Sequence, residues 1–309
     1  MNPQNYGFSF NNIQIKENLV IKEGKNQIGI DKIQKETQFY LYITNNKIPF
    51  SIPKYIDSTP TSLTIEYLKN TTTLTNHITQ ENIDYYYQHI LRHLEPLHKI
   101  EKETSIEQIK QDILYEIETK VLERYNKTDW TSLINPTQFN EIKTINHIPF
   151  KTIEIYIDKI KTKIANILEQ TNPTSYQLIH GDIHLGNILV ETENLDPQLY
   201  FIDPRGFFGK TTLFGLKEYD QAKLLFGLSG YSIFDTMEIE ILDIENGNLN
   251  IDWIKQYEYL FDKPYWTQLD ILLCLSIWLG NNSCFINPYK KLTSLMIAFY
   301  YCEKILGPF

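Results

Sequence analysis

Residues 178–190, LIHGDIHLGNILV, and residues 199–206, LYFIDPRG, decide the fold of this chain. The first segment carries an apolar run into a short polar loop that holds Asp182 and Asn187. The second is an apolar strand that ends at Asp203, and the proline after it cannot continue a strand ladder. The spacing therefore predicts two carboxylates and one carboxamide at adjacent strand ends.

These polar groups are the ones that phosphoryl transfer requires. One carboxylate can orient an acceptor hydroxyl, and carboxylate and amide oxygens are ligands that Mg²⁺ prefers beside phosphate groups. An ordinary β-turn with Asp and Asn as turn formers explains either motif alone. Both motifs in this order favour a functional site.

The composition indicates a soluble globular protein. The chain has 309 residues, 42% of them hydrophobic and 22% charged, with a net charge of −9. This acidity disfavours a nucleic-acid partner. Three cysteines without a CxxC pair suggest neither a disulfide framework nor a thiolate zinc site. The N-terminus lacks a secretion signal and residues 271–280 form too short an apolar run to cross a membrane, so we expect a cytoplasmic protein.

The residue pattern predicts an α+β protein with two lobes. Short β-prone runs at residues 13–15, 19–22, 52–55 and 62–67 surround one helical pattern at residues 30–43. Helical periods dominate afterwards, at residues 80–100, 106–124, 153–169, 213–228, 251–261, 266–279 and 289–305. We expect lobes at residues 1–68 and 69–309, with a hinge near residues 66–69.

The motif pair resembles the catalytic core of the aminoglycoside phosphotransferase and choline kinase family, which shares the protein-kinase-like fold. The family pattern of His-Gly-Asp, four residues, Asn and then an Ile-Asp strand end matches His180, Asp182, Asn187 and Asp203 in order. By this resemblance, Asp182 is the catalytic base, His180 braces the loop, and Asn187 and Asp203 bind Mg²⁺. The fold implied is a small antiparallel β N-lobe with one helix and a larger, mainly helical C-lobe.

Matches outside the core extend the resemblance over most of the chain. LVIKEG puts Lys22 at the position of the phosphate-contacting lysine, and KETQFY puts Glu36 at the position of its ion-pair partner. Each residue taken alone is better explained as a solvated surface charge, but the order of the two upstream of the catalytic loop favours the functional role. In KEYDQAKLL, Asp220 matches the aspartate that supports the catalytic loop, with a helix N-cap as the competing and compatible role.

The run SLTIEYL resembles the hinge of the family. There, backbone groups near Glu66, Tyr67 and Leu68 are expected to meet the adenine of ATP. The helix that ends LEPLHKI resembles the Leu-His helix of the family, and we expect His98 to serve packing rather than catalysis.

Two features depart from the common pattern. Residues 6–12, YGFSFNN, contain a single glycine in place of a glycine-rich phosphate loop. Pro204 and Arg205 follow the metal-binding aspartate, and Arg205 is equally consistent with a phosphate or acidic-substrate contact and with a salt bridge. IDPRG variants resemble a branch associated with bacterial surface-polysaccharide loci.

The resemblance implies an ATP-dependent kinase for a small hydroxylated molecule, such as a sugar, an amino sugar or a choline-like or aminoglycoside-like compound. Two alternatives stay open. A catalytically inactive kinase-like protein would only bind the nucleotide. A metal-dependent hydrolase would use His180, Asp182 and His184 on one side of a strand, with Asp203 as a bridge.

Overall fold

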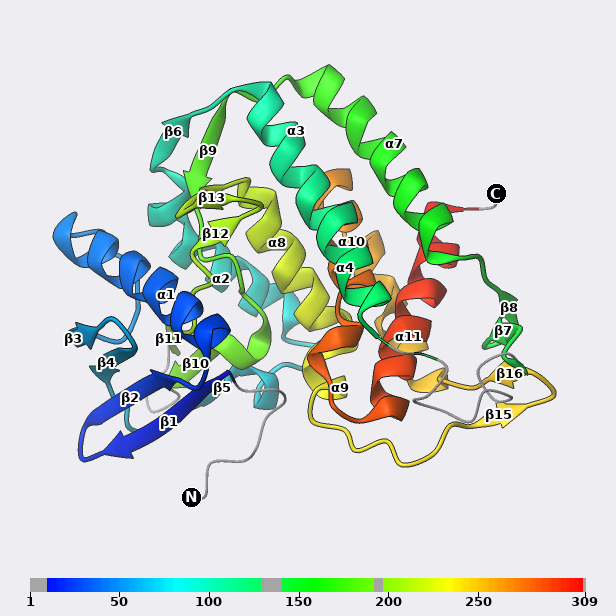
Figure 1. Cartoon of the computed structure of the whole chain (residues 1–309), viewed down its shortest axis with the longest axis horizontal. Helices are drawn as coiled ribbons and strands as arrows, with labels where there is room; N and C mark the ends of the chain where they lie inside the picture. Colours follow the sequence, from blue (N-terminus) through cyan, green and yellow to red (C-terminus); the bar gives the residue numbers. More distant parts are fainter. Residues whose placement is uncertain (1–9, 129, 131–140, 192–196, 308–309) are drawn as a thin grey trace. The chain divides into compact units, whose positions relative to one another are not determined.

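The computed structural model describes residues 10–128, 130, 141–191 and 197–307. These residues form two compact units, and each unit joins two separate segments of the chain. Figure 1 labels the helices and strands of the chain. We call residues 10–105 and 174–227 the site unit, and the described residues of 106–173 and 228–307 the helical unit. The division into lobes at residue 68 stays a prediction.

The site unit begins with a four-stranded antiparallel sheet, in the order β1-β2-β4-β3. Helix α1 (Gln27–Asn45) packs on one face of this sheet and starts at Asn26, whose side chain accepts a hydrogen bond from the Gly29 N–H. The buried core of this layer consists of Ile33, Tyr40, Leu63 and Ile65. The strands are β1 (Asn11–Lys16), β2 (Leu19–Gly24), β3 (Tyr55–Thr59) and β4 (Ser62–Glu66).

Short antiparallel sheets carry the polar motifs within the same unit. Their orders are β11-β10-β5, β14-β9-β6 and β12-β13. The helical elements of this part are η1 (Leu74–Asn76), α2 (Ile83–His98), η3 (Leu185–Asn187) and α8 (Lys217–Phe226). The strands are β5 (Thr71–Thr73), β6 (Glu101–Glu103), β9 (Ser175–Leu178), β10 (Ile188–Glu191), β11 (Gln198–Phe201), β12 (Phe207–Phe208), β13 (Thr211–Thr212) and β14 (Phe214–Gly215).

The helical unit is built around α10 (Gln268–Leu279), which is apolar on nearly all sides and almost wholly buried. Thr267 and Asp270 form a capping box at its start. The other helices are α3 (Ile106–Leu114), η2 (Tyr115–Thr119), α4 (Lys120–Asn126), α7 (Ile153–Thr171), α9 (Ser232–Phe234), η5 (Asp252–Asp262), η6 (Asn282–Cys284) and α11 (Pro288–Leu306). The small sheet β15-β16-β7-β8 consists of β7 (Thr144–Ile145), β8 (Ile148–Pro149), β15 (Ile244–Glu245) and β16 (Asn248–Leu249). The segment η4 (Gly227–Tyr231) follows α8 and is kinked, because Ser229 and Gly230 have non-helical backbone angles.

The expected fold class is confirmed. The N-terminal part holds antiparallel sheets with one helix packed on them, and the C-terminal part is mainly helical. Among the described residues, no helix is both long and apolar enough to span a membrane.

Three predicted elements differ in detail. Residues 52–55 contribute only Tyr55 to β3, and the α-helix predicted at residues 251–261 is the 3₁₀ helix η5 (Asp252–Asp262). Residues 213–228 begin as strand β14, because Phe214 pairs with Leu178 of β9, and the helix starts only at Lys217.

Candidate active site

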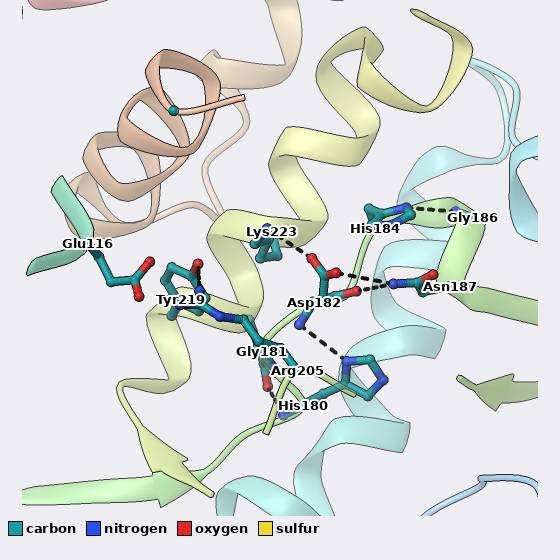
Figure 2. A network of polar contacts seen from close by, with 12 residues as sticks. Glu116, His180, Gly181, Asp182, His184, Gly186, Asn187, Arg205, Tyr219 and Lys223 are labelled. Atoms are coloured by element: carbon teal, nitrogen blue, oxygen red, sulfur yellow. Dashed lines mark hydrogen bonds and ion pairs between the residues drawn. The ribbon is translucent and has the colours of Figure 1, made fainter. Parts of the chain in front are cut away.

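The HGDIHLGN motif forms the connection between strands β9 and β10. Figure 2 shows its residues His180, Asp182 and Asn187. Residues 179–184 form a loop, and η3 follows, with His184 at its N-cap accepting a hydrogen bond from the Gly186 N–H. Gly181 has a φ of +81°, and a Cβ there would lie 3.2 Å from the Cβ of Arg205. The loop therefore requires glycine at this position, both for its backbone conformation and for close approach.

Asp182 projects from this loop with its side chain 32% exposed. Its Oδ1 lies 2.9 Å from Nζ of Lys223, its carbonyl oxygen accepts a hydrogen bond from Asn187 Nδ2 at 2.9 Å, and its N–H donates to His180 Nδ1. Burial raises the pKa of Asp182, but the Lys223 ammonium, with His184 and Arg205, holds that pKa well below its usual range. Asp182 is therefore an ionised hydrogen-bond acceptor at neutral pH.

His180 lies fully buried beneath the loop. The rings of Phe39, Phe50 and Phe201 meet its imidazole edge-on. Burial lowers the pKa of His180 to about 4, against the opposing effect of neighbouring carboxylates. A buried, neutral imidazole whose Nδ1 accepts the Asp182 N–H fits the predicted role of bracing the loop.

Asn187 and Asp203 come together because strands β10 and β11 pair antiparallel. The Ile202 N–H donates to the Asn187 carbonyl at 3.0 Å. Asp203, the next residue after Ile202, therefore lies beside Asn187 at the end of η3. Asp203 has a φ of +55° and a side chain that is 45% exposed. A non-glycine residue in the left-handed region is unfavourable, and such conformations concentrate at functional sites.

Lys22 joins the β-sheet of the site unit to this loop region. Its side chain is 6% exposed on β2, and its Nζ lies 2.6 Å from Oε1 of Glu36 on α1. The same ammonium contacts Oδ1 of Asp203. Lys22, the predicted phosphate lysine, thus contacts both its predicted ion-pair partner Glu36 and the predicted metal ligand Asp203.

Asp220 is fully buried on α8, under the HGD segment. Its Oδ1 accepts from the Gly181 N–H at 2.6 Å, and its Oδ2 accepts from the His180 N–H at 3.1 Å. His98 Nε2 lies 3.0 Å from the same Oδ2. The His98 ring therefore helps to hold the Asp220 carboxylate, in addition to the packing that the sequence predicts.

Arg205 packs its guanidinium over the Phe207 ring, 3.8 Å from the ring centroid, and hydrogen-bonds to the Tyr219 hydroxyl. Its N–H donates to the His180 carbonyl at 2.9 Å. The backbone of Arg205 therefore fastens the turn after Asp203 to the loop, and its side chain connects that turn to helix α8.

The predicted hinge residues lie at the end of β4. The Tyr67 N–H donates to the Asn18 carbonyl at 2.8 Å, and the Leu68 carbonyl accepts from the Thr71 hydroxyl at 3.0 Å. A hollow of about 300 Å³ is lined by Asn18, Glu66, Tyr67, Leu68, Lys69, Thr71, Glu191 and Tyr200.

The sheet register sets the separation between this hinge and Lys22. Lys22 of β2 pairs with Leu63 of β4, and Leu63 lies three residues before Glu66 on β4. Three residues of a β-strand extend over about 10 Å, so Lys22 and the hinge are separated by about that distance along the sheet. A nucleotide can span that distance. Gly7, the single glycine of residues 6–12, lies outside the described residues.

Lys223 is a site residue that the sequence reasoning missed. It lies three positions after Asp220 on α8, so both side chains occupy the same face of that helix. This spacing was the available signal, because Asp220 was already expected beneath the loop.

The hydrolase alternative placed His180, Asp182 and His184 on one side of a strand, and the structure does not have that strand. His180, Asp182 and His184 lie in a loop and not on a strand, and the His180 and His184 Nδ1 atoms accept backbone N–H groups. Within the described part of the chain, no three His, Cys, Asp or Glu side chains are grouped as metal ligands.

Comparison with known proteins agrees with this geometry. No curated protein matches the chain. The solved structure of choline kinase from Cryptosporidium parvum Iowa II is similar, with a TM-score of 0.51, 11% identity, and coverage of 98% of this chain and 92% of that one. The gentamicin complex of APH(2″)-IIa has a TM-score of 0.50, 14% identity, and coverage of 94% and 87%. A thermostable mutant of APH(4)-Ia with ADP and hygromycin B has a TM-score of 0.50, 12% identity, and coverage of 96% and 92%.

The sequence model of the Phosphotransferase enzyme family (APH) matches residues 7–206, which include Lys22, the loop and Asp203. This match covers more than half of the chain, and the similar structures share its fold. The chain therefore belongs to the phosphotransferase enzyme family.

Proposed function

We propose that this phosphotransferase is an ATP-dependent kinase that transfers the γ-phosphate to a hydroxyl group of a small molecule. The observation that carries the proposal is the contact of Lys22 with Asp203, across 181 residues of sequence. It joins the predicted phosphate lysine to a loop system in which Asp182 and Asn187 are also in contact. These are the group types that phosphoryl transfer uses.

In this proposal Asp182 orients the acceptor hydroxyl. Its carboxylate is ionised and partly exposed, and its backbone N–H and carbonyl are hydrogen-bonded to His180 and Asn187. Because the transition state of phosphoryl transfer is loose, positioning of the hydroxyl matters more than strong proton abstraction. A low pKa for Asp182 is compatible with that role.

Asn187 and Asp203 would hold Mg²⁺. The donor set fits, because Asn187 commits its Nδ2 to the Asp182 carbonyl and so keeps its amide oxygen as the ligand atom. Asp203 adds a carboxylate that is 45% exposed. Carboxylate and amide oxygens with phosphate oxygens form a usual Mg²⁺ environment, in which the ion neutralises charge on the phosphates.

Lys22 would hold the nucleotide phosphates, with Glu36 fixing the ammonium at 2.6 Å. Backbone groups of Glu66, Tyr67 and Leu68 would meet the adenine. ATP as the donor is supported by the similar APH(4)-Ia structure, which contains ADP. The acceptor class we propose is a sugar, amino sugar, choline-like or aminoglycoside-like molecule, in line with the choline kinase and the aminoglycoside-bound structures.

The test is an ATP-consumption assay with a panel of sugars, amino sugars, choline and aminoglycosides. We expect acceptor-dependent turnover that needs Mg²⁺ and falls by about 10²–10⁴-fold in Asp182→Asn. Asp203→Ala should abolish metal-dependent turnover while the protein stays folded. Asp158→Ala, which removes a carboxylate that is 76% exposed on α7, is the matched control and should leave the rate unchanged.

The same protein sample separates the alternatives. ATP-induced thermal stabilisation without turnover of any acceptor would favour a nucleotide-binding protein without kinase activity. Stoichiometric zinc in the purified protein, with no response to ATP, would favour a hydrolase. Wild-type rates in Asp203→Ala would refute the assigned metal site.

A further inference from the structure

One face of helix α8 holds the predicted catalytic loop at successive points. Asp220 accepts the N–H groups of His180 and Gly181, and Lys223, one turn later, binds the side chain of Asp182. At the end of the helix, a Cβ on Gly227 would lie 3.1 Å from Cα of His184. Asp220 thus fixes the backbone of the loop, whereas Lys223 acts on the side chain proposed to meet the substrate.

The Lys223 ammonium is well placed to restrain that side chain. Its Nζ lies 2.9 Å from Asp182 Oδ1, and the lysine side chain is only 14% exposed (Figure 2). The Tyr219 and Phe226 rings flank the ammonium, with centroids 5.9 and 5.7 Å away. A long side chain that is buried along its length loses the freedom to leave its partner, so the ion pair is more persistent than one on the surface.

The two oxygens of the Asp182 carboxylate are held unequally. Oδ1 has the close contact with Lys223, whereas Oδ2 is 3.5 Å from Asn187 Nδ2, at the limit of a hydrogen bond. With Oδ1 committed, rotation about the Cβ–Cγ bond is restricted, and Oδ2 keeps the capacity to accept a further hydrogen bond. An acceptor hydroxyl would use this second oxygen.

We propose that Lys223 is a positioning residue of the phosphoryl-transfer site, which holds Oδ1 of Asp182 so that Oδ2 is presented to the acceptor hydroxyl. This inference rests on the proposed kinase function, and it adds a residue that lies beyond the match of the family model to residues 7–206. Lys223 acts through Asp182 alone. It is therefore expected to affect the rate of transfer more than the binding of ATP.

The central variant is Lys223→Met, which keeps the length of the side chain and removes its charge. We expect kcat to fall by about 10- to 100-fold, because a misplaced reacting group commonly costs up to that factor. KM for ATP should change less than twofold. Lys223→Arg restores a cation and should recover most of the rate, and Lys217→Met, an exposed lysine of the same helix, is the control with a wild-type rate.

A double-mutant cycle separates positioning from a general effect on the fold. If Lys223 acts through Asp182, adding Lys223→Met to Asp182→Asn should lower the residual rate less than twofold. A full additional loss in that background would overturn the inference, as would a wild-type kcat in Lys223→Met. An effect confined to KM for ATP would also overturn it.

Lys223→Cys provides a second measurement if the methionine variant folds poorly. Alkylation of the folded protein with 2-bromoethylamine rebuilds an ammonium at this position and should restore turnover. Wild-type protein treated in the same way controls for modification of Cys284, which is partly exposed. Failure of the alkylated protein to regain activity would contradict the inference.

The outcome also distinguishes this inference from the proposed function. An active wild type whose rate is lost in Asp182→Asn but kept in Lys223→Met refutes the role of Lys223 and leaves the kinase intact. A wild type that turns over no ATP, with any acceptor or with water, refutes both.

Discussion

Replacement of Asp220 is the sharpest test of how the loop is supported. Asp220→Ala removes a fully buried carboxylate that accepts hydrogen bonds from two backbone N–H groups and from His98 Nε2. Each buried donor left without a partner costs about 1–3 kcal/mol. The two backbone donors alone therefore give about 2–6 kcal/mol, and we expect a loss of about 4 kcal/mol in the free energy of unfolding.

Urea unfolding at pH 7, followed by tryptophan fluorescence and by circular dichroism, measures this loss. The midpoint should fall with an unchanged slope, because the surface exposed on unfolding is nearly the same. Asp220→Asn keeps one acceptor oxygen and should lose about half as much. Glu218→Ala removes a carboxylate from the same first turn of α8 and should cost less than about 1 kcal/mol, the range of a helix-dipole effect.

A loss below about 1 kcal/mol in Asp220→Ala, or a loss equal to that of Glu218→Ala, would refute this reasoning. Either result would mean that the loop backbone finds other partners when the carboxylate is removed.

Three further predictions concern other parts of the site. Lys22→Met leaves the buried carboxylate of Glu36 unpaired and should cost about 3 kcal/mol of stability, and adding Glu36→Met should recover much of that stability without restoring ATP turnover in the same assay. Burial lowers the pKa of His180 to about 4, so between pH 6.5 and pH 4 the unfolded chain protonates this histidine and the folded chain does not. The free energy of unfolding should therefore fall by up to about 3 kcal/mol as the pH is lowered over that interval. Urea titrations measure this fall, which should be smaller in His180→Asn. Gly181→Ala forces a Cβ onto a left-handed residue and should lower the thermal midpoint more than Gly186→Ala, whose φ is not positive; equal shifts in the two variants would contradict the assigned strain.

The sequence predicted the parts of this fold in which local pattern and tertiary structure agree. The α+β class, α1, α7, α10 and α11 followed from apolar periodicity. Strand β14 was not predicted, because the local pattern at Phe214 and Gly215 resembles the start of a helix. The two residues form a strand by pairing with β9, which lies more than 30 residues earlier in the chain. The 3₁₀ form of η5 has an apolar spacing close to that of an α-helix, so the pattern could not separate the two.

The candidate site shows the same division. Lys22, Asp182, Asn187 and Asp203 could be predicted as site residues from the sequence, since each lies in a recognisable motif. The contacts between these motifs could not be predicted, because the packing of the helices and strands decides which side chains meet. The hydrogen bond of His98 to Asp220 and the ion pair of Lys223 with Asp182 are of this second kind.

The discontinuous build of the site unit determines when, during synthesis, the site can form. Lys22 meets Asp203 across 181 residues, and His98 meets Asp220 across 122, with one whole segment of the helical unit encoded between the two parts. Contacts of such high sequence separation carry a large closure entropy and form late in folding. A nascent chain that ends before residue 187 holds Lys22 and Glu36 but neither predicted metal ligand. The N-terminal β-sheet therefore acquires its partners within the site unit only after residues 174–227 have been synthesised.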